Sequence, residues 1–267
     1  MEPLLSVRDL KVGLHTDQSE LRLVRGISFD VHKGQRLGIA GESGSGKSLT
    51  LRAIQGLLQP PFYRSGSLTF IGEEWDLSTV PPDESPLLRA SGGAAMVFQE
   101  AKNSLSPYLS IGRQALQLPA LRGWGTDEAG SRVMDTLGSL GLRDPERVFR
   151  SYPHQLSGGE CQRVATALGL LQNPVVLLAD EPTTQLDALV QVSVLDAISR
   201  ACPPAETALV LVSHDLAVLG AMVDRIVVMR QGELVDGGTA EELLIGSREN
   251  RHPYTLRLRD AYAGLAS

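Results

Sequence analysis

Short apolar runs of strand length alternate along the chain with longer segments whose apolar residues recur at helical spacing. This alternation is typical of an α/β domain, in which buried parallel strands are connected by helices. The pattern predicts five such strands: Leu37–Ala40, Ala95–Phe98, Val175–Ala179, Ala208–Ser213 and Ile226–Met229. We therefore expect a mainly parallel core sheet.

Two segments depart from that pattern. Leu4–Val31 alternates apolar and polar residues more closely, which favours an antiparallel β flank. Between Gln99 and Pro174 the strand signal fades, and the stretches SRVMDTLGSLGL and GECQRVATALGLLQN carry helical spacing instead. An inserted helical subdomain is the simplest account. The stretch STVPPDESP at 78–86 predicts an exposed loop.

A chain of 267 residues is long enough to bury the core of one large domain. We expect a single domain over residues 1–267. Its expected parts are a core at about 1–99 and 174–245, a helical subdomain at about 100–173 and a short C-terminal tail at 246–267.

The composition weighs against several classes of function. With 25 basic and 31 acidic residues the net charge is −6, which gives no general attraction to nucleic acid, so we predict no nucleic-acid partner. Two cysteines, Cys161 and Cys202, are too few for a disulfide framework and fit a reducing cytoplasm. The opening MEPLLSVRDL has no long apolar core, so we expect neither a secretory signal nor a transmembrane anchor.

The polar turn GESGSGKS at 41–48 fits the pattern G-x-x-x-x-G-K-[ST] in full and lies between a strand-like and a helix-like run. Glycines let consecutive backbone N–H groups converge on an anion, and the following helix directs its positive end at the same point. Lys47 would reach the outer phosphates, and the Ser48 hydroxyl would bind Mg²⁺. The predicted phosphate-binding residues are Gly41, Glu42, Ser43, Gly44, Ser45, Gly46, Lys47, Ser48 and Leu49.

The alternative is a flexible Gly/Ser loop that matches this pattern by chance. The chain has only four lysines against 21 arginines, yet a lysine stands at position 47. A compact ammonium fits a nest of backbone amides better than a broad guanidinium does. This choice of residue favours the phosphate site.

A second chemical signal is the acidic pair in VVLLADEP at 175–182, directly after an apolar strand. Successive side chains of a strand point to opposite faces, so Asp180 and Glu181 are expected to do different jobs. Asp180 suits the Mg²⁺ shell, and Glu181 suits polarising a water for attack on the γ-phosphate. The alternative is a helix cap or a solvated turn.

The third signal is LSGGECQR at 156–163. Ser157 followed three residues later by Glu160 forms a capping box, which predicts that a helix begins here with Gly158 and Gly159 in its first turn. The exposed amides of such a helix start would make a second anion-binding surface, formed by residues 157–160. The alternative is an ordinary N-cap with no ligand.

In this order the three segments resemble the nucleotide-binding subunits of ABC transporters, from about Leu4 to Leu244. The resemblance identifies three further residues: Gln99 in MVFQE as the Q-loop glutamine, Asp187 in TQLD as the end of the D-loop, and His214 in VSHD as the switch histidine. It implies that Gln99 links Mg²⁺ and water to the helical subdomain, that His214 contacts the γ-phosphate, and that Glu181 orients or activates the attacking water.

The resemblance also implies the cofactors and partners. ATP and Mg²⁺ would be held between the phosphate loop of one subunit and the signature helix of a second ABC ATPase subunit, in a head-to-tail dimer. Two membrane permease subunits and an extracytoplasmic solute-binding protein would complete the complex. Residues at about 100–120 would contact a permease, so the chain would lie peripherally on the cytoplasmic face of the membrane.

Within the family, VFQEAKNSLSPYLSIGRQ, LADEPTTQLDALVQ and HPYT at 252–255 are most similar to subunits that energise import of di- and oligopeptides or nickel. The substrate class therefore stays open between a peptide and nickel or a metal chelate. The rival function is a soluble ABC-type ATPase that acts on nucleic acid or ribosomes. The chain departs from the family at Leu14 and His15, where an adenine-stacking aromatic is usual, and at Gln185, where alanine is usual.

Overall fold

The computed structural model describes residues 2–15, 19–80, 85, 87, 93–99, 101–118, 123–184, 186–204 and 206–265, except for the side chains of Asn103 and of residues 263–265. The chain forms two compact units. One combines the residues up to Ala94 with those from Pro204 onwards, and the other extends from Ala95 to Pro203. Most of the predicted loop at 78–86, and also Gln185, lie outside the described residues.

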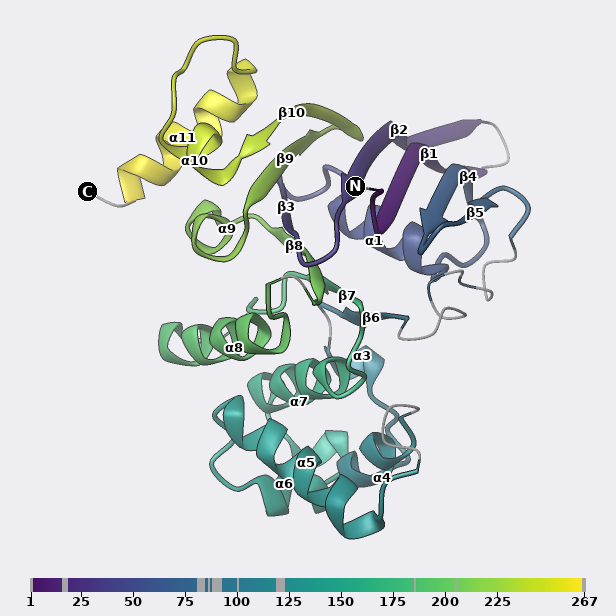
Figure 1. Ribbon diagram of the computed structural model, residues 1–267, viewed down its shortest axis with the longest axis vertical. Helices are drawn as coiled ribbons and strands as arrows, with labels where there is room; N and C mark the ends of the chain where they lie inside the picture. The colour runs from purple at the N-terminus through teal and green to yellow at the C-terminus, as the bar shows by residue number, and fades with distance from the viewer. Residues whose placement is uncertain are drawn as a thin grey trace. The chain divides into compact units, whose positions relative to one another are not determined.

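The first unit contains an antiparallel sheet with the strand order β2-β1-β4-β5, drawn in purple and blue in Figure 1. Its strands are β1 (Leu5–His15), β2 (Glu20–Val31), β4 (Phe62–Phe70) and β5 (Glu73–Asp76). In β2, alternate residues Ile27, Phe29 and Val31 are buried, as expected for a sheet with one apolar face. The predicted antiparallel flank is confirmed, although β4 and β5 were not predicted.

The same unit contains a second group of strands with the order β10-β9-β3-β8. These are β3 (Arg36–Ala40), β8 (Ala208–Ser213), β9 (Arg225–Arg230) and β10 (Glu233–Thr239). Strand β3 is parallel to both β8 and β9, whereas β10 pairs antiparallel with β9. The three predicted strands of this group are confirmed to within one residue at each end, and every residue of β8 is buried.

The register of this sheet brings three chain segments to one edge. Ala40 at the end of β3 pairs with Ser213 at the end of β8 and with Val228 on β9. Because parallel strands end at the same edge, the loops that follow them are neighbours there. The helices of this unit are α1 (Lys47–Gln55), α9 (Leu216–Met222), α10 (Ala240–Leu244) and α11 (Pro253–Leu265).

The second unit is mostly helical and contains the helices labelled α3 to α8 in Figure 1. Its helices are α3 (Ala101–Ser104), α4 (Ile111–Leu116), α5 (Thr126–Ser139), α6 (Pro145–Arg150), the short 3₁₀ turn η2 (Pro153–Gln155), α7 (Gly158–Leu170) and α8 (Ala188–Ala201). Helix α5 packs against α4, α6 and α7. Its strands β6 (Ala94–Val97) and β7 (Val176–Asp180) are neighbours and are fully buried.

Among the described residues, no helix combines the length and the apolar character needed to cross a lipid bilayer. Cys161 and Cys202 are both buried, and neither forms a disulfide. Burial raises the pKa of Cys161, which packs in α7 with its sulfur 3.5 Å from the carbonyl oxygen of Pro153. This cysteine is a small packing residue of its helix.

Candidate functional site

The phosphate loop connects β3 to α1 in the first unit and is organised around a buried lysine. Lys47 is 4% exposed, and its ammonium donates hydrogen bonds to the carbonyl oxygens of Gly41 and Glu42 at 2.8 and 2.9 Å. The loop therefore encircles a fixed positive charge at the N-terminal end of a nine-residue helix. A polyphosphate placed at that end would meet both the ammonium and the positive end of the helix dipole.

Two glycines of this loop occupy positions where any side chain would collide with neighbouring atoms. Gly46 has φ 106°, and a Cβ there would lie 2.8 Å from the methyl carbon of Met229. A Cβ on Gly41 would overlap the carbonyl oxygen of Met229 and lie 2.8 Å from the Ser45 hydroxyl. The backbone of the loop is thus packed closely onto β9, and only glycine permits that approach.

The remaining predicted residues of the loop have two kinds of environment. Glu42, Ser43 and Gly44 are exposed at its tip, whereas Ser45 is buried. Ser48 and Leu49 lie half-buried in the first turn of α1. The Ser48 hydroxyl stands one residue after the ammonium of Lys47, at the place where the pattern requires a magnesium ligand.

His214 lies in the same unit as the phosphate loop and next to it in the sheet. It directly follows Ser213, the residue of β8 that pairs with Ala40 immediately before Gly41. The histidine is exposed, and the following residue, Asp215, begins α9 by accepting a hydrogen bond from the N–H of Ala217. The fold therefore places the predicted switch histidine at the strand edge that carries the phosphate loop.

The acidic pair belongs to the second unit. Asp180 is 1% exposed and ends β7, but Glu181 lies one residue beyond the strand with a left-handed φ of 44°. The sequence pattern predicts one strand for both residues, with alternation along it as the reason that their side chains separate. That reason is wrong, because Glu181 lies outside the strand and the backbone changes direction there. The carboxylate of Glu181 accepts a hydrogen bond from the Thr184 hydroxyl at 3.0 Å. Sequence reasoning had not singled out this threonine.

The predicted helix start at Ser157 is confirmed. Helix α7 begins at Gly158, the Ser157 hydroxyl accepts from the N–H of Glu160, and the Glu160 carboxylate accepts from the N–H of Ser157. The guanidinium of Arg147 also forms an ion pair with Glu160. These bonds fix the capping residues Ser157 and Glu160. Between them, the first turn of α7 consists of Gly158 and Gly159, which have no side chains to cover the backbone.

Because of Glu160, the stability of this unit should decrease at acidic pH. Burial raises the pKa of Glu160, but hydrogen bonds from Ser157 and Arg147 outweigh burial, so the pKa lies below its ordinary value of 4.5. A carboxyl group whose pKa is lower in the folded than in the unfolded protein stabilises the fold at any pH above its unfolded-state pKa. This stabilisation is lost as the pH falls through its folded-state pKa. We expect Glu160→Gln to remove part of the drop in melting temperature between about pH 5 and about pH 3. Thermal melts across that range would test this, with the exposed Glu128→Gln as control; curves parallel to wild type would contradict it.

A glutamine that the sequence analysis did not single out connects three predicted motifs of the second unit. Gln162 in α7 is 5% exposed, and its amide donates to the carbonyl oxygens of Phe98 and Pro182 at 3.0 and 3.2 Å. Phe98 precedes Gln99, and Pro182 follows Glu181. One buried side chain thus joins the signature helix, the Q-loop and the turn that carries the acidic pair.

Replacing Gln162 with leucine should destabilise the protein and also slow ATP hydrolysis. The substitution keeps the volume but removes the donor to the buried carbonyl oxygen of Pro182 and to the partly buried one of Phe98, which costs about 1–3 kcal/mol in the free energy of unfolding. Denaturant unfolding and steady-state turnover measure the two effects. The control is Gln172→Leu, which lies just beyond the end of α7 and whose half-buried amide donates to the carbonyl oxygen of Leu168 at 3.5 Å. Equal stability of the two variants would contradict the bridging role.

The last two predicted residues, Gln99 and Asp187, are also in the second unit. Gln99 is exposed just beyond β6. Asp187 is the N-cap of α8, with its carboxylate accepting from the N–H of Val190 at 3.1 Å. In this structure the D-loop aspartate therefore begins a helix.

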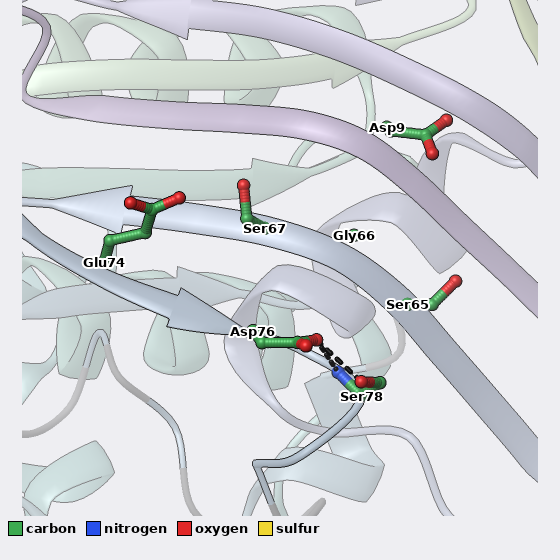
Figure 2. A pocket seen from close by; sticks show the side chains of 7 residues that line it. All are labelled: Asp9, Ser65, Gly66, Ser67, Glu74, Asp76 and Ser78. Carbon is green, nitrogen blue, oxygen red and sulfur yellow. Dashed lines mark hydrogen bonds between the residues drawn. The ribbon is translucent and has the colours of Figure 1, made fainter.

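A hollow of about 670 Å³ on the antiparallel sheet of the first unit is not a phosphate site (Figure 2). It is lined by three carboxylates, Asp9, Glu74 and Asp76, and by Ser65, Ser67 and Ser78. Asp76 accepts hydrogen bonds from the Ser78 backbone and hydroxyl, as the dashed lines show. Like charges disfavour an anionic ligand, so the phosphate loop remains the candidate nucleotide site.

Comparison with known proteins shows the family to which this chain belongs. Residues 24–184 match the family described as ABC transporter. The oligopeptide transport ATP-binding protein OppD of Bacillus subtilis is 36% identical over 256 residues, which cover 94% of this chain and 70% of that protein. The dipeptide transport ATP-binding protein DppD of Haemophilus influenzae is 39% identical over 259 residues, covering 96% of this chain and 76% of that protein.

Among solved structures, the dimeric post-hydrolysis state of the ATP-binding cassette MJ0796, bound to ADP and Pi, superposes with a TM-score of 0.76 at 26% identity. The match covers 88% of this chain and 98% of that one. The fold class and the resemblance expected from the sequence are confirmed by these findings. The chain therefore belongs to the ABC transporter family, among the ATP-binding subunits that include the oligopeptide and dipeptide transport proteins.

Proposed function

We propose that this chain is one of two ATPase subunits of an importer for peptides, with ATP and Mg²⁺ bound at the phosphate loop. The observation that carries the proposal is the buried ammonium of Lys47, enclosed by its glycine loop at the start of α1. The relatives named above are oligopeptide and dipeptide transport proteins, which supports a peptide rather than nickel as the substrate.

The site residues have the chemistry that Mg²⁺ and the γ-phosphate require. Ser48, Gln99 and Asp180 supply hydroxyl, amide and carboxylate oxygens, the ligand types that bind Mg²⁺ in proteins. When bound, the ion neutralises charge on the phosphate oxygens. Glu181, held by Thr184, would orient or activate the attacking water, and His214 would contact the γ-phosphate.

A second ATPase subunit, identical or different, would complete each nucleotide site. Residues 157–160 would provide the partner surface, because the start of α7 offers backbone amides to an anion. The first turns of α8, which follow Asp187, expose the apolar side chains of Leu189 and Val192, 84% and 65% exposed. Such exposed apolar residues favour a protein contact here. The solved structure of MJ0796, a bacterial ABC transporter cassette, is dimeric, which supports the presence of a second subunit.

Two permease subunits and an extracytoplasmic solute-binding protein would be the remaining partners, with this chain on the cytoplasmic face of the membrane. The segment at about 100–120 includes α3 and α4 among its described residues, and its Tyr108 is 86% exposed. An exposed aromatic ring is a common anchor in protein interfaces. This supports the segment as the contact with a permease.

Affinity purification of the tagged chain from gently solubilised membranes tests the transport function. We expect two integral membrane proteins to co-purify, and ATP hydrolysis by the complex to rise when a peptide-loaded binding protein is added. Recovery of ribosomes or nucleic acid without membrane proteins would instead favour the soluble ABC-type ATPase. Stimulation by nickel or a nickel chelate, and not by peptides, would reassign the substrate.

A further inference from the structure

The C-terminal helix α11 contacts the phosphate loop through one tyrosine. Tyr254, its second residue, is 5% exposed. Its hydroxyl oxygen accepts a hydrogen bond from the backbone N–H of Glu42 at 2.7 Å, although the two residues are 212 positions apart in sequence. Glu42 is the residue directly after Gly41 in the phosphate loop. A side chain from the end of the chain thus fixes one peptide group of the nucleotide site.

Neighbouring residues hold the tyrosine in place. The guanidinium of Arg230, at the end of β9, lies 5.2 Å from the centre of the Tyr254 ring, and that of Arg257 lies at 5.8 Å. These distances suit cation–π attraction. Burial raises the pKa of Tyr254, so the hydroxyl remains a neutral hydrogen-bonding group at physiological pH.

The segment that leads into α11 is itself anchored on the sheet. Asp236 on β10 has a side chain that is only 9% exposed, and it pairs with the guanidinium of Arg251 at 3.0 Å. The same carboxylate accepts from the backbone N–H of His252 at 3.1 Å. After these anchors, the backbone N–H of Tyr254 donates to the His252 ring nitrogen at 3.1 Å. The tyrosine therefore approaches the loop from a fixed support.

A second support of the phosphate loop comes from the same part of the chain. The N–H of Gly232, in the turn between β9 and β10, donates to the carbonyl oxygen of Ser45 at 3.0 Å. Gly232 and Tyr254 both lie outside residues 24–184, where the family match is found. The conformation of the phosphate loop thus depends on C-terminal residues that are not part of its motif.

We propose that Tyr254 is a positioning residue for the phosphate loop, and that through it the C-terminal segment sets the affinity for nucleotide. The hydrogen bond fixes the Glu42 peptide and keeps the following amides directed at the phosphates. A loop already held in its binding conformation loses less conformational entropy when the ligand binds. This inference rests on the proposed nucleotide binding at the loop.

The test is Tyr254→Phe in the full chain, compared with Tyr262→Phe eight residues later on the same helix. Phenylalanine keeps the ring and its packing but removes the hydroxyl. We expect the Kd for a fluorescent ATP analogue to rise about 3- to 10-fold, the effect of losing one hydrogen bond that orders the site. The KM for ATP should rise by a similar factor while kcat changes less than about twofold.

Amide hydrogen exchange gives a second readout that requires no nucleotide. In Tyr254→Phe, exchange should accelerate in peptides covering Gly41–Gly46 and stay unchanged in peptides from β8. An unchanged Kd, an equal effect of Tyr262→Phe, or a uniform acceleration over the whole unit would overturn the role of Tyr254. Failure of the wild-type chain to bind ATP would instead refute the proposed function, while the exchange data would still decide whether Tyr254 holds the loop.

Discussion

Replacing Glu181 with glutamine is expected to lower steady-state ATP hydrolysis by at least about a hundredfold while ATP binding stays close to wild type. A positioned general base typically contributes about 10²- to 10⁴-fold to the rate, and an amide cannot accept the proton of the attacking water. Glutamine has the same shape, and its amide oxygen can still accept from the Thr184 hydroxyl that holds Glu181. The fold of the turn should therefore survive the substitution.

Three measurements separate catalysis from binding in this variant. Release of phosphate reports turnover, equilibrium titration reports ATP affinity, and size-exclusion chromatography with ATP reports the nucleotide-bound dimer, which we expect to accumulate. Glu146→Gln, an exposed residue of the same unit that pairs with Arg150, is the matched control. Unchanged turnover in Glu181→Gln would assign the catalytic base to another residue.

Lys47→Ala is expected to weaken ATP binding by about 10- to 100-fold and to lower hydrolysis correspondingly. Hydrogen bonds to charged groups contribute about 1.5–3 kcal/mol each, and in the proposed site this buried ammonium would face the phosphates. It also joins Gly41 to Glu42 through their carbonyl oxygens, so its removal loosens the loop itself. Arginine should not restore binding, because a planar guanidinium does not fit a nest shaped for a compact ammonium.

Lys11→Ala is the control for this loss of charge, since Lys11 pairs with Asp9 on the surface of the antiparallel sheet at 2.7 Å. Surface ion pairs of this kind contribute little to stability, and we expect wild-type ATP affinity. Titration with ATP at constant Mg²⁺ compares the variants. Equal affinity of Lys47→Ala and Lys11→Ala would show that the phosphates bind elsewhere.

The two groups of site residues are organised by different means. In the first unit, parallel pairing of β3 with β8 brings the phosphate loop and His214 to one sheet edge. In the second unit, one buried amide, that of Gln162, joins three motifs. The roles of Gln99 and His214 in catalysis, and of Asp187 in nucleotide binding, stay predictions.

The features that the sequence by itself determined are those that depend on neighbouring residues. The capping box at Ser157 starts α7 through bonds that span three residues, and the buried strands β3, β7, β8 and β9 follow from continuous apolar runs. The phosphate loop is likewise contained in eight consecutive residues. Local hydrogen bonding and burial leave these segments few alternatives, so their type could be predicted without the fold.

Only the tertiary structure decided the features that join distant parts of the chain. Strands β4, β5 and β10 are rich in polar residues and form because a neighbouring strand supplies their hydrogen bonds, so no apolar run predicts them. The bond between Tyr254 and Glu42 spans 212 residues, and no spacing rule relates two such positions. A hydrogen bond between residues so far apart in sequence depends on how the helices and strands pack around the core. Local periodicity carries no information about that packing.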